Sequence, residues 1–254
     1  MMMANKYKLK FHIMSVEENA KNIFQFLHTN SDLDNWFSTT ILDELGIDKS
    51  KLQYLNNSDR YKFILSKIEN KLNQNQQYLS EKAKAFEEEW NSVSAEIFNI
   101  YSKIFNLQFN EDKHCQVNIG VNPICPRYIQ EKSFDINYKQ KSCIPIAIHE
   151  LLHFYWFDYW NEHLYKLKDF EMENPTLTWA FSEIAIDTLV NCSPLLKYFS
   201  NTEVAYDYFY EIKYKDKPLV NVLRDLYYKN GLKTYMTEGF KIISSEDIKN
   251  KMLN

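Results

Sequence analysis

The sequence of 254 residues contains only four glycines and six prolines. Because these residues form tight turns and interrupt regular structure, their scarcity favours long helices joined by few turns. A long apolar run is also lacking: no segment, including residues 1–14, has the unbroken apolar length of a signal-peptide core or a membrane span. We therefore expect a mainly helical, cytoplasmic protein.

Cysteine is scarce as well. The four cysteines are Cys115, Cys125, Cys143 and Cys192, and no two of them have the C-x-x-C spacing of zinc or redox motifs. Reduced thiols in or near the core are the expected state, with a disulfide or a thiol ligand to a metal as the alternatives.

Neither sign of charge is in large excess. The chain has 30 lysines and arginines against 34 aspartates and glutamates, which gives a net charge of -4, and no long run of either sign occurs. Nucleic acids and anionic membranes attract concentrated positive charge, and the sequence shows no such cluster. We expect neither of them as a partner, and a small molecule or a peptide is the simpler assumption for a substrate.

The sequence does contain enough apolar material for a substantial core, with 45% hydrophobic and 16% aromatic residues. A chain of this length and composition forms one domain or two small ones. Residues 1–110 are predicted to form a mainly helical N-terminal region, and residues 111–254 a region of short strands and further helices. The two regions can also form one continuous domain.

In the first region, the alternating segment 6–14 predicts a short strand. Residues 15–18 read Ser-Val-Glu-Glu, which has the form of a capping box and marks the start of a helix. Apolar residues at steps of three and four predict two more helices, at about 58–72 and 78–106. The polar stretch 73–77 is predicted to be the loop between them.

In the second region, the β-branched and aromatic segments 115–121 and 133–138 predict two strands joined by a proline-containing loop. Pro145 suits the first turn of a helix that continues through Trp160. A further helix is expected at 177–190. Three shorter helical segments follow, near 203–212, 217–230 and 245–253. The predicted fold class is α+β and predominantly helical.

Residues 149–153 read His-Glu-Leu-Leu-His, which is the H-E-x-x-H pattern. On a helix, this spacing places the imidazoles of His149 and His153 on one face, where both can bind the same ion. Neutral imidazole nitrogens suit zinc, and Glu150 can approach a water on the metal as a general base. The flanking residues are strongly apolar, so these polar groups are costly to bury unless a metal satisfies them. The sequence therefore predicts one zinc ion or a similar divalent ion.

A catalytic zinc ion usually has three protein ligands. A third histidine in the metzincin pattern is excluded, because the positions that need glycine and histidine hold Trp156 and Tyr159. The better candidate is Glu183, in a second apolar helical segment. Asp187 lies one turn further on the same face, where its carboxylate can accept a hydrogen bond from a ligand histidine, expected to be His149. The alternative is a helix whose two acids face solvent.

An H-E-x-x-H helix followed by a later helix with E-x-x-x-D resembles the gluzincin group of zinc metallopeptidases, which includes thermolysin. The resemblance covers about residues 133–191. It implies a zincin-like fold with a small sheet beside the active-site helix, the two histidines and Glu183 as zinc ligands, and Glu150 as the general base. The separation between the second histidine and Glu183 is longer than in thermolysin, which implies an insertion at about 158–176.

The resemblance also gives roles to residues outside the motif. In zincins the edge strand of a small sheet pairs with an extended substrate, so Phe134 and Ile136 are expected to contact the peptide. The alternative is that their strand only covers the core. Related enzymes use a tyrosine or a histidine beyond the third ligand to stabilise the oxyanion, and Tyr228 is preferred because its helical stretch could fold over the cleft. The other candidates are Tyr206, Tyr208, Tyr210, Tyr227 and Tyr235.

The predicted function is that of a zinc-dependent metallopeptidase, which hydrolyses a bond of a peptide or protein substrate with an activated water. Two other functions are compatible with the sequence. The first is a non-catalytic zinc protein, in which a fourth ligand such as Cys143 or Cys192 closes the coordination shell. The second is a helical interaction module in which the histidines and the glutamate are incidental.

Overall fold

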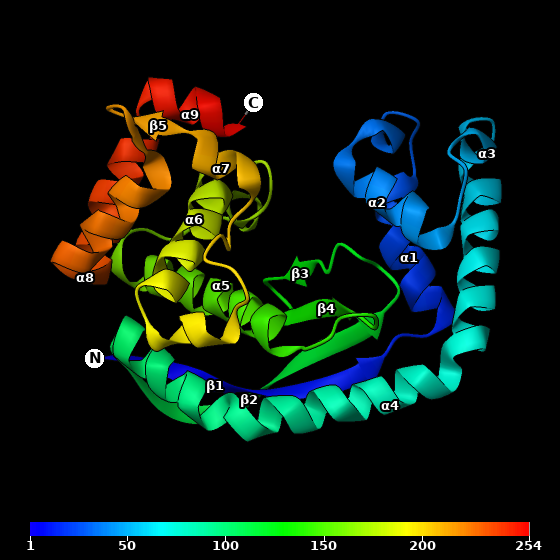
Figure 1. The fold of residues 1–254 in the computed structure, drawn as a ribbon, viewed down its shortest axis with the longest axis horizontal. Helices are drawn as coiled ribbons and strands as arrows, with labels where there is room; N and C mark the ends of the chain where they lie inside the picture. Colours follow the sequence, from blue (N-terminus) through cyan, green and yellow to red (C-terminus); the bar gives the residue numbers. More distant parts are fainter. Residues whose placement is uncertain (254) are drawn as a thin grey trace. The chain divides into compact units, whose positions relative to one another are not determined.

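The computed structural model describes residues 1–253 and shows an α+β protein that is predominantly helical (Figure 1). The chain divides into two compact units. Unit 1 comprises residues 1–6, residues 93–112 and the described residues from 144 onward, and unit 2 comprises residues 7–92 and 113–143. This division differs from the predicted boundary at residue 110, because three elements each contribute residues to both units.

The main sheet has four strands in the order β1–β2–β4–β3. The strands are β1 (Met2–Ile13), β2 (Leu107–Gly120), β3 (Arg127–Tyr128) and β4 (Ser133–Asn137). β4 is parallel to β2, with Ile136 opposite Ile119, and antiparallel to β3. The strands expected at 6–14, 115–121 and 133–138 are confirmed, although β1 and β2 are longer than predicted.

β4 lies inside the sheet, between β2 and β3, rather than at an edge. Beyond the two residues of β3, the backbone N–H of Asp135 still donates to the carbonyl of Pro126 at 2.9 Å. The side chains of Phe134 and Ile136 are fully buried. The expectation of a free edge strand that pairs with an extended substrate is therefore wrong, and these two residues belong to the core of unit 2.

Unit 2 also contains three helices and the first part of a fourth. They are α1 (Val16–Leu27), α2 (Trp36–Leu45), α3 (Ser50–Gln53) and α4 (Asn57–Phe105), and a 3-10 turn, η1 (Asp32–Asp34), precedes α2. The capping box before α1 is confirmed, since the backbone N–H of Glu18 donates to Ser15 Oγ at 3.1 Å and the backbone N–H of Ser15 donates to the Glu18 carboxylate at 2.7 Å.

α4 is a single helix of 49 residues, so the loop predicted at 73–77 is wrong. No glycine or proline interrupts this polar stretch, and asparagine or glutamine in a helix interior costs at most about 0.7 kcal/mol relative to alanine. Asn75 even donates from Nδ2 to the Lys71 carbonyl at 2.7 Å. Figure 1 shows the helix bending without a break.

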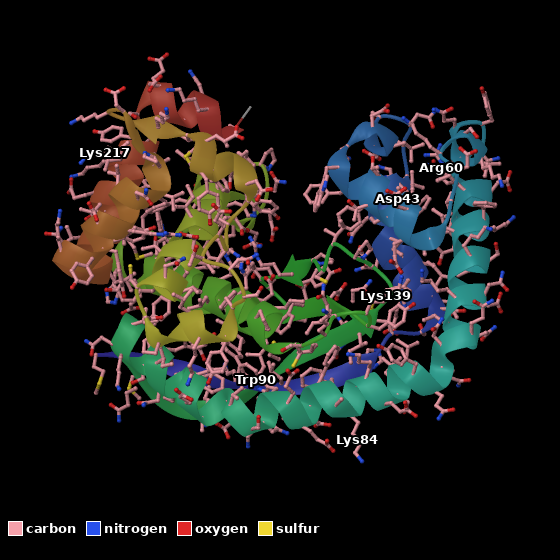
Figure 2. All side chains as sticks on the ribbon, in the orientation of Figure 1. Asp43, Arg60, Lys84, Trp90, Lys139 and Lys217 are labelled. Atoms are coloured by element: carbon pink, nitrogen blue, oxygen red, sulfur yellow. The ribbon has the colours of Figure 1, made fainter. Side chains whose placement is uncertain are left out.

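Arg60, near the start of α4, connects this helix to α1 and α3 (Figure 2). Its buried guanidinium donates to the carbonyls of Leu27, at the end of α1, and Leu52, in α3, at 2.9 and 2.8 Å. A cation is favourable there because helix C-termini carry partial negative charge.

A buried polar network joins α1 to the sheet in unit 2. The carboxylate of Asp135 on β4 accepts from Asn22 Nδ2 at 2.6 Å and from Asn118 Nδ2 at 2.9 Å, and the Tyr128 hydroxyl lies 3.4 Å away. Asn122 extends the network by donating to Asn22 Oδ1 at 2.5 Å. Burial raises the pKa of Asp135 to about 6, although these donors oppose the shift.

Unit 1 contains α5 (Ile144–His163) and α6 (Leu177–Asn191), which confirm the helices predicted around the motif and the third ligand. The region between them, where the insertion was expected, holds the end of α5 and the 3-10 turn η2 (Asp169–Met172). After α6 come η3 (Pro194–Tyr198), α7 (Asp207–Glu211), β5 (Lys213–Tyr214), β6 (Lys217–Pro218), α8 (Leu219–Ile243) and α9 (Glu246–Leu253).

α8 extends well beyond the predicted segment 217–230, but its backbone is interrupted at Gly231, which has a φ of 74°. Glycine adopts this left-handed conformation without the steric cost that a side chain would add. Among residues 1–253, no helix is both long enough and apolar enough to cross a membrane.

Candidate metal centre

α5 carries the H-E-x-x-H residues and is fixed by hydrogen bonds from neighbouring elements of unit 1. The hydroxyl of Tyr101, on α4, donates to the carbonyl of Ile148 at 3.0 Å, directly before His149. The hydroxyl of Tyr155 donates to the Asn5 carbonyl at 2.8 Å. Both tyrosines are fully buried. Hydrogen bonds shielded from water are stronger than exposed ones, so these two bonds fix the position of α5.

Thr176 caps the N-terminus of α6, because its Oγ1 accepts a hydrogen bond from the backbone N–H of Trp179 at 3.1 Å. It packs on α5 through Phe181, whose ring centroid lies 5.3 Å from that of Trp156. It also approaches α8 closely, because a Cβ on Gly239 would lie only 2.8 Å from Phe181 Cζ. These contacts set the position of Glu183, which lies two residues after Phe181.

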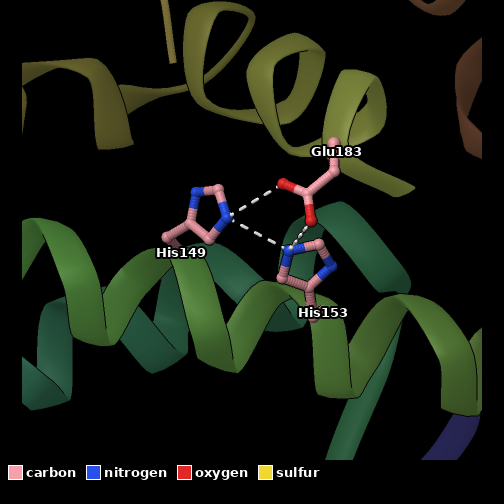
Figure 3. A group of neighbouring side chains, drawn as sticks. All are labelled: His149, His153 and Glu183. Carbon is pink, nitrogen blue, oxygen red and sulfur yellow. Dashed lines mark hydrogen bonds and ion pairs between the residues drawn. The ribbon is translucent and has the colours of Figure 1, made fainter. Parts of the chain in front are cut away.

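His149, His153 and Glu183 meet at one point (Figure 3). The two histidines extend from adjacent turns of α5, and the glutamate extends toward them from α6. Glu183 Oε2 lies 3.3 Å from His149 Nε2, and Glu183 Oε1 lies 3.4 Å from His153 Nε2. The two Nε2 atoms are 3.1 Å apart. The expectation that Glu183 shares a site with both histidines therefore agrees with the structure.

The spacing of these atoms matches the ligand shell of a tetrahedral zinc ion. With zinc–ligand distances of about 2.0–2.1 Å, the ligand atoms of a regular tetrahedron lie about 3.3–3.4 Å from one another. The three observed separations, 3.1, 3.3 and 3.4 Å, are close to this value. His153 and Glu183 are almost fully buried. Burial of such polar groups is costly, and a bound cation would offset this cost.

The group has three members, and no other histidine, cysteine, aspartate or glutamate of residues 1–253 belongs to it. Cys192, one of the two possible fourth ligands, is therefore not part of the site. The Cys143 thiol is buried, lies 3.3 Å from the Phe86 carbonyl, and has its pKa raised by burial. Since thiolate is the form that binds metal, this residue is poorly suited to the role. Three ligands with a fourth position open are typical of catalytic zinc sites.

Glu150 follows His149 directly on α5 and is buried, with 7% of its surface exposed. This location next to a ligand is compatible with the predicted general base. Its catalytic role stays a prediction.

Asp187 lies one turn after Glu183, as predicted, but its carboxylate binds other groups. Arg224 of α8 donates to it from Nε and Nη2 at 2.8 Å each, and Tyr210 donates from its hydroxyl. No hydrogen bond joins it to His149 in the described part of the chain. The expected partnership with His149 is replaced by one with Arg224, a residue that the sequence pattern did not single out.

Tyr228, the preferred oxyanion donor, is 83% exposed on α8, and the structure gives no support for its role. Tyr208 of α7, which is 40% exposed, is the tyrosine whose pKa responds to the charge of Glu183. Its pKa is raised to about 12, chiefly by burial and further by the negative charge of Glu183.

The remaining tyrosines have other contacts. Tyr210 binds Asp187, Tyr235 is buried in the core, and the rings of Tyr206 and Tyr227 pack against Trp179 and Tyr235, respectively. No local sequence feature distinguishes Tyr208 from them, because the effect of Glu183 on its pKa depends on the tertiary structure.

Comparisons with known protein families, with curated proteins and with solved structures find no match to this chain. The assignment of a function therefore depends on the residues and their geometry.

Proposed function

We propose that this protein is a zinc-dependent metallopeptidase with a zincin-like catalytic region, in which His149, His153 and Glu183 bind one zinc ion. The observation that carries the proposal is the convergence of two imidazoles and one carboxylate, from two helices, at separations of 3.1 to 3.4 Å. The adjacent glutamate of the H-E-x-x-H pattern adds the acid-base group that amide hydrolysis requires.

A zinc ion on these ligands would supply Lewis-acid activation of a water molecule and of the substrate carbonyl. The Glu150 carboxylate would accept a proton from the attacking water and later deliver it to the nitrogen of the leaving amine. The Tyr208 hydroxyl would donate a hydrogen bond to the carbonyl oxygen as negative charge develops on it. A tyrosine hydroxyl, with an ordinary pKa of about 10, is protonated at neutral pH, as a donor must be.

The test combines metal content with turnover in the full chain. We expect about one zinc per chain in the wild type, and replacement of the ligand by Glu183→Gln should lower this content. Glu150→Gln should retain zinc but slow hydrolysis of a mixed peptide library by at least about 100-fold, the usual contribution of a general base. Glu162→Gln is the matched control, because Glu162 is exposed on the same helix and should leave both quantities unchanged.

Three outcomes are informative. A fully active Glu150→Gln variant would refute the role of this residue. Less than about half an equivalent of zinc in the wild type after gentle purification would contradict the metal site itself. Full zinc content without hydrolysis of any peptide would favour the non-catalytic zinc protein.

A further inference from the structure

Unit 1 contains a cavity of about 670 Å³. α6 contributes Trp179 to its wall, α7 contributes Tyr208, and α9 contributes Met252. This volume lies in the range of about 300–1,000 Å³ that ligand sites have, and is large enough for a few peptide residues.

The cavity and the metal centre share helix α6. Trp179 lies four residues before Glu183 on α6, so the two side chains are on the same face of the helix, one turn apart. Tyr208, the proposed oxyanion donor, also lines the cavity. A substrate bound at the metal centre would reach the cavity wall one helical turn along α6.

The wall combines apolar and cationic side chains. Trp179, Ile212 and Met252 are nearly buried and supply an aromatic and aliphatic surface. Lys213 and Lys251 add positive charge, whereas Glu211 is the one acidic residue of the lining.

The two lysines differ in their partners. Lys251 Nζ lies 2.8 Å from Asp247 Oδ2, so its charge is already compensated. Lys213 makes no ion pair with any residue of the described chain, which leaves its ammonium available to a ligand anion.

We propose that this cavity is a substrate subsite for a bulky apolar side chain that lies beside a carboxylate, with Lys213 as the partner of that carboxylate. This inference depends on the proposed function, because it treats the occupant as part of a peptide. The carboxylate has two possible sources, the C-terminus of the peptide or the side chain of an aspartate or glutamate.

Binding can be measured without turnover on the zinc-loaded Glu150→Gln protein by isothermal titration calorimetry. The probes are N-acetyl-Leu-Phe with a free carboxylate, its amide, and N-acetyl-Leu-Gly with a free carboxylate. We expect the free acid with phenylalanine to bind at least about 10-fold more tightly than either of the other two, a difference of about 1.4 kcal/mol.

Lys213→Gln in the same background should remove the difference between acid and amide. Lys217→Gln is the matched control, because this lysine, labelled in Figure 2, lies in the same hairpin. It is not among the residues that line the cavity. The amide of N-acetyl-Phe-Glu separates the two carboxylate sources: tight binding assigns the recognition to an acidic side chain, and weak binding assigns it to the C-terminus. Equal binding of acid and amide to the parent protein would overturn the proposal.

The failure of this inference is distinguishable from the failure of the proposed function. Suppose that the wild-type protein hydrolyses peptides, but that kcat/KM is the same for free and amidated C-termini. If kcat/KM is also the same whether an acidic or a neutral residue lies beside the bulky apolar residue, the result supports the peptidase and contradicts the subsite. Selective, Lys213-dependent binding in a protein that hydrolyses no peptide supports the carboxylate site and contradicts the peptidase.

Discussion

At the scale of single residues, Asp135 gives unit 2 a pH-dependent stability. Burial raises its pKa to about 6, well above the ordinary value of 3.8, so the folded state favours the protonated form. Its contribution to the free energy of unfolding is therefore fully present below about pH 4 and is lost as the pH rises through about 6. A shift of this size corresponds to about 3 kcal/mol.

Asp135→Asn removes this titration. The stability of the variant relative to the wild type should increase by up to about 3 kcal/mol between pH 4 and pH 7. Urea unfolding of both proteins across this range measures the difference, in which the titration of all other groups cancels. A difference that does not change with pH, or that changes in the opposite direction, would contradict the assignment.

At the scale of elements, the segment 202–210 is held on α6 and α8 by the buried carboxylate of Asp187. Arg224 binds this carboxylate through two nitrogens and donates to the Thr202 carbonyl at 2.9 Å. The Tyr210 hydroxyl donates to Asp187 and accepts from the backbone N–H of Val204 at 2.8 Å. The same segment carries Tyr208, so these bonds position the proposed oxyanion donor.

Arg224→Met should destabilise the protein by about 3–5 kcal/mol, because it leaves the fully buried Asp187 charge uncompensated. In the molecules that remain folded, we expect a lower kcat with zinc content unchanged, since Arg224 binds no metal ligand. Lys229→Met is the matched control: it breaks an exposed ion pair with Asp225 on the same helix and should change stability by no more than about 0.5 kcal/mol. Similar losses in both variants would argue against the positioning role.

At the scale of the whole molecule, zinc should act as a folding ligand. The three proposed ligands come from two helices and are brought together only in the folded chain. An ion that binds only the folded state at about 1,000 times its Kd adds about 4 kcal/mol to the free energy of unfolding. Urea unfolding in zinc and in a chelator measures this gain.

The zinc-dependent gain in stability should persist in Glu150→Gln, because Glu150 is not one of the proposed ligands. It should fall in Glu183→Gln, because the neutral amide replaces the negatively charged carboxylate that would bind the ion. An equal gain in both variants would show that zinc stabilises the protein at another place.

The sequence by itself determined the features that depend on neighbouring residues. Helix spacing places His149 and His153 on one face of α5 whatever surrounds the helix, and the capping box before α1 needs only Ser15 and Glu18. The apolar surroundings of Glu183 also identified it as a buried acid in a second helix. These predictions succeeded because contacts within about four residues follow from backbone geometry.

Tertiary structure alone decided the rest. The position of β4 inside the sheet and the partner of Asp187 each depend on residues far apart in the chain. The same is true of the effect of Glu183 on the pKa of Tyr208. Packing also fixes the distance between α5 and α6, through the contact of Trp156 with Phe181. A local pattern can propose metal ligands, but the convergence of their atoms follows from long-range packing, which periodicity and spacing do not encode.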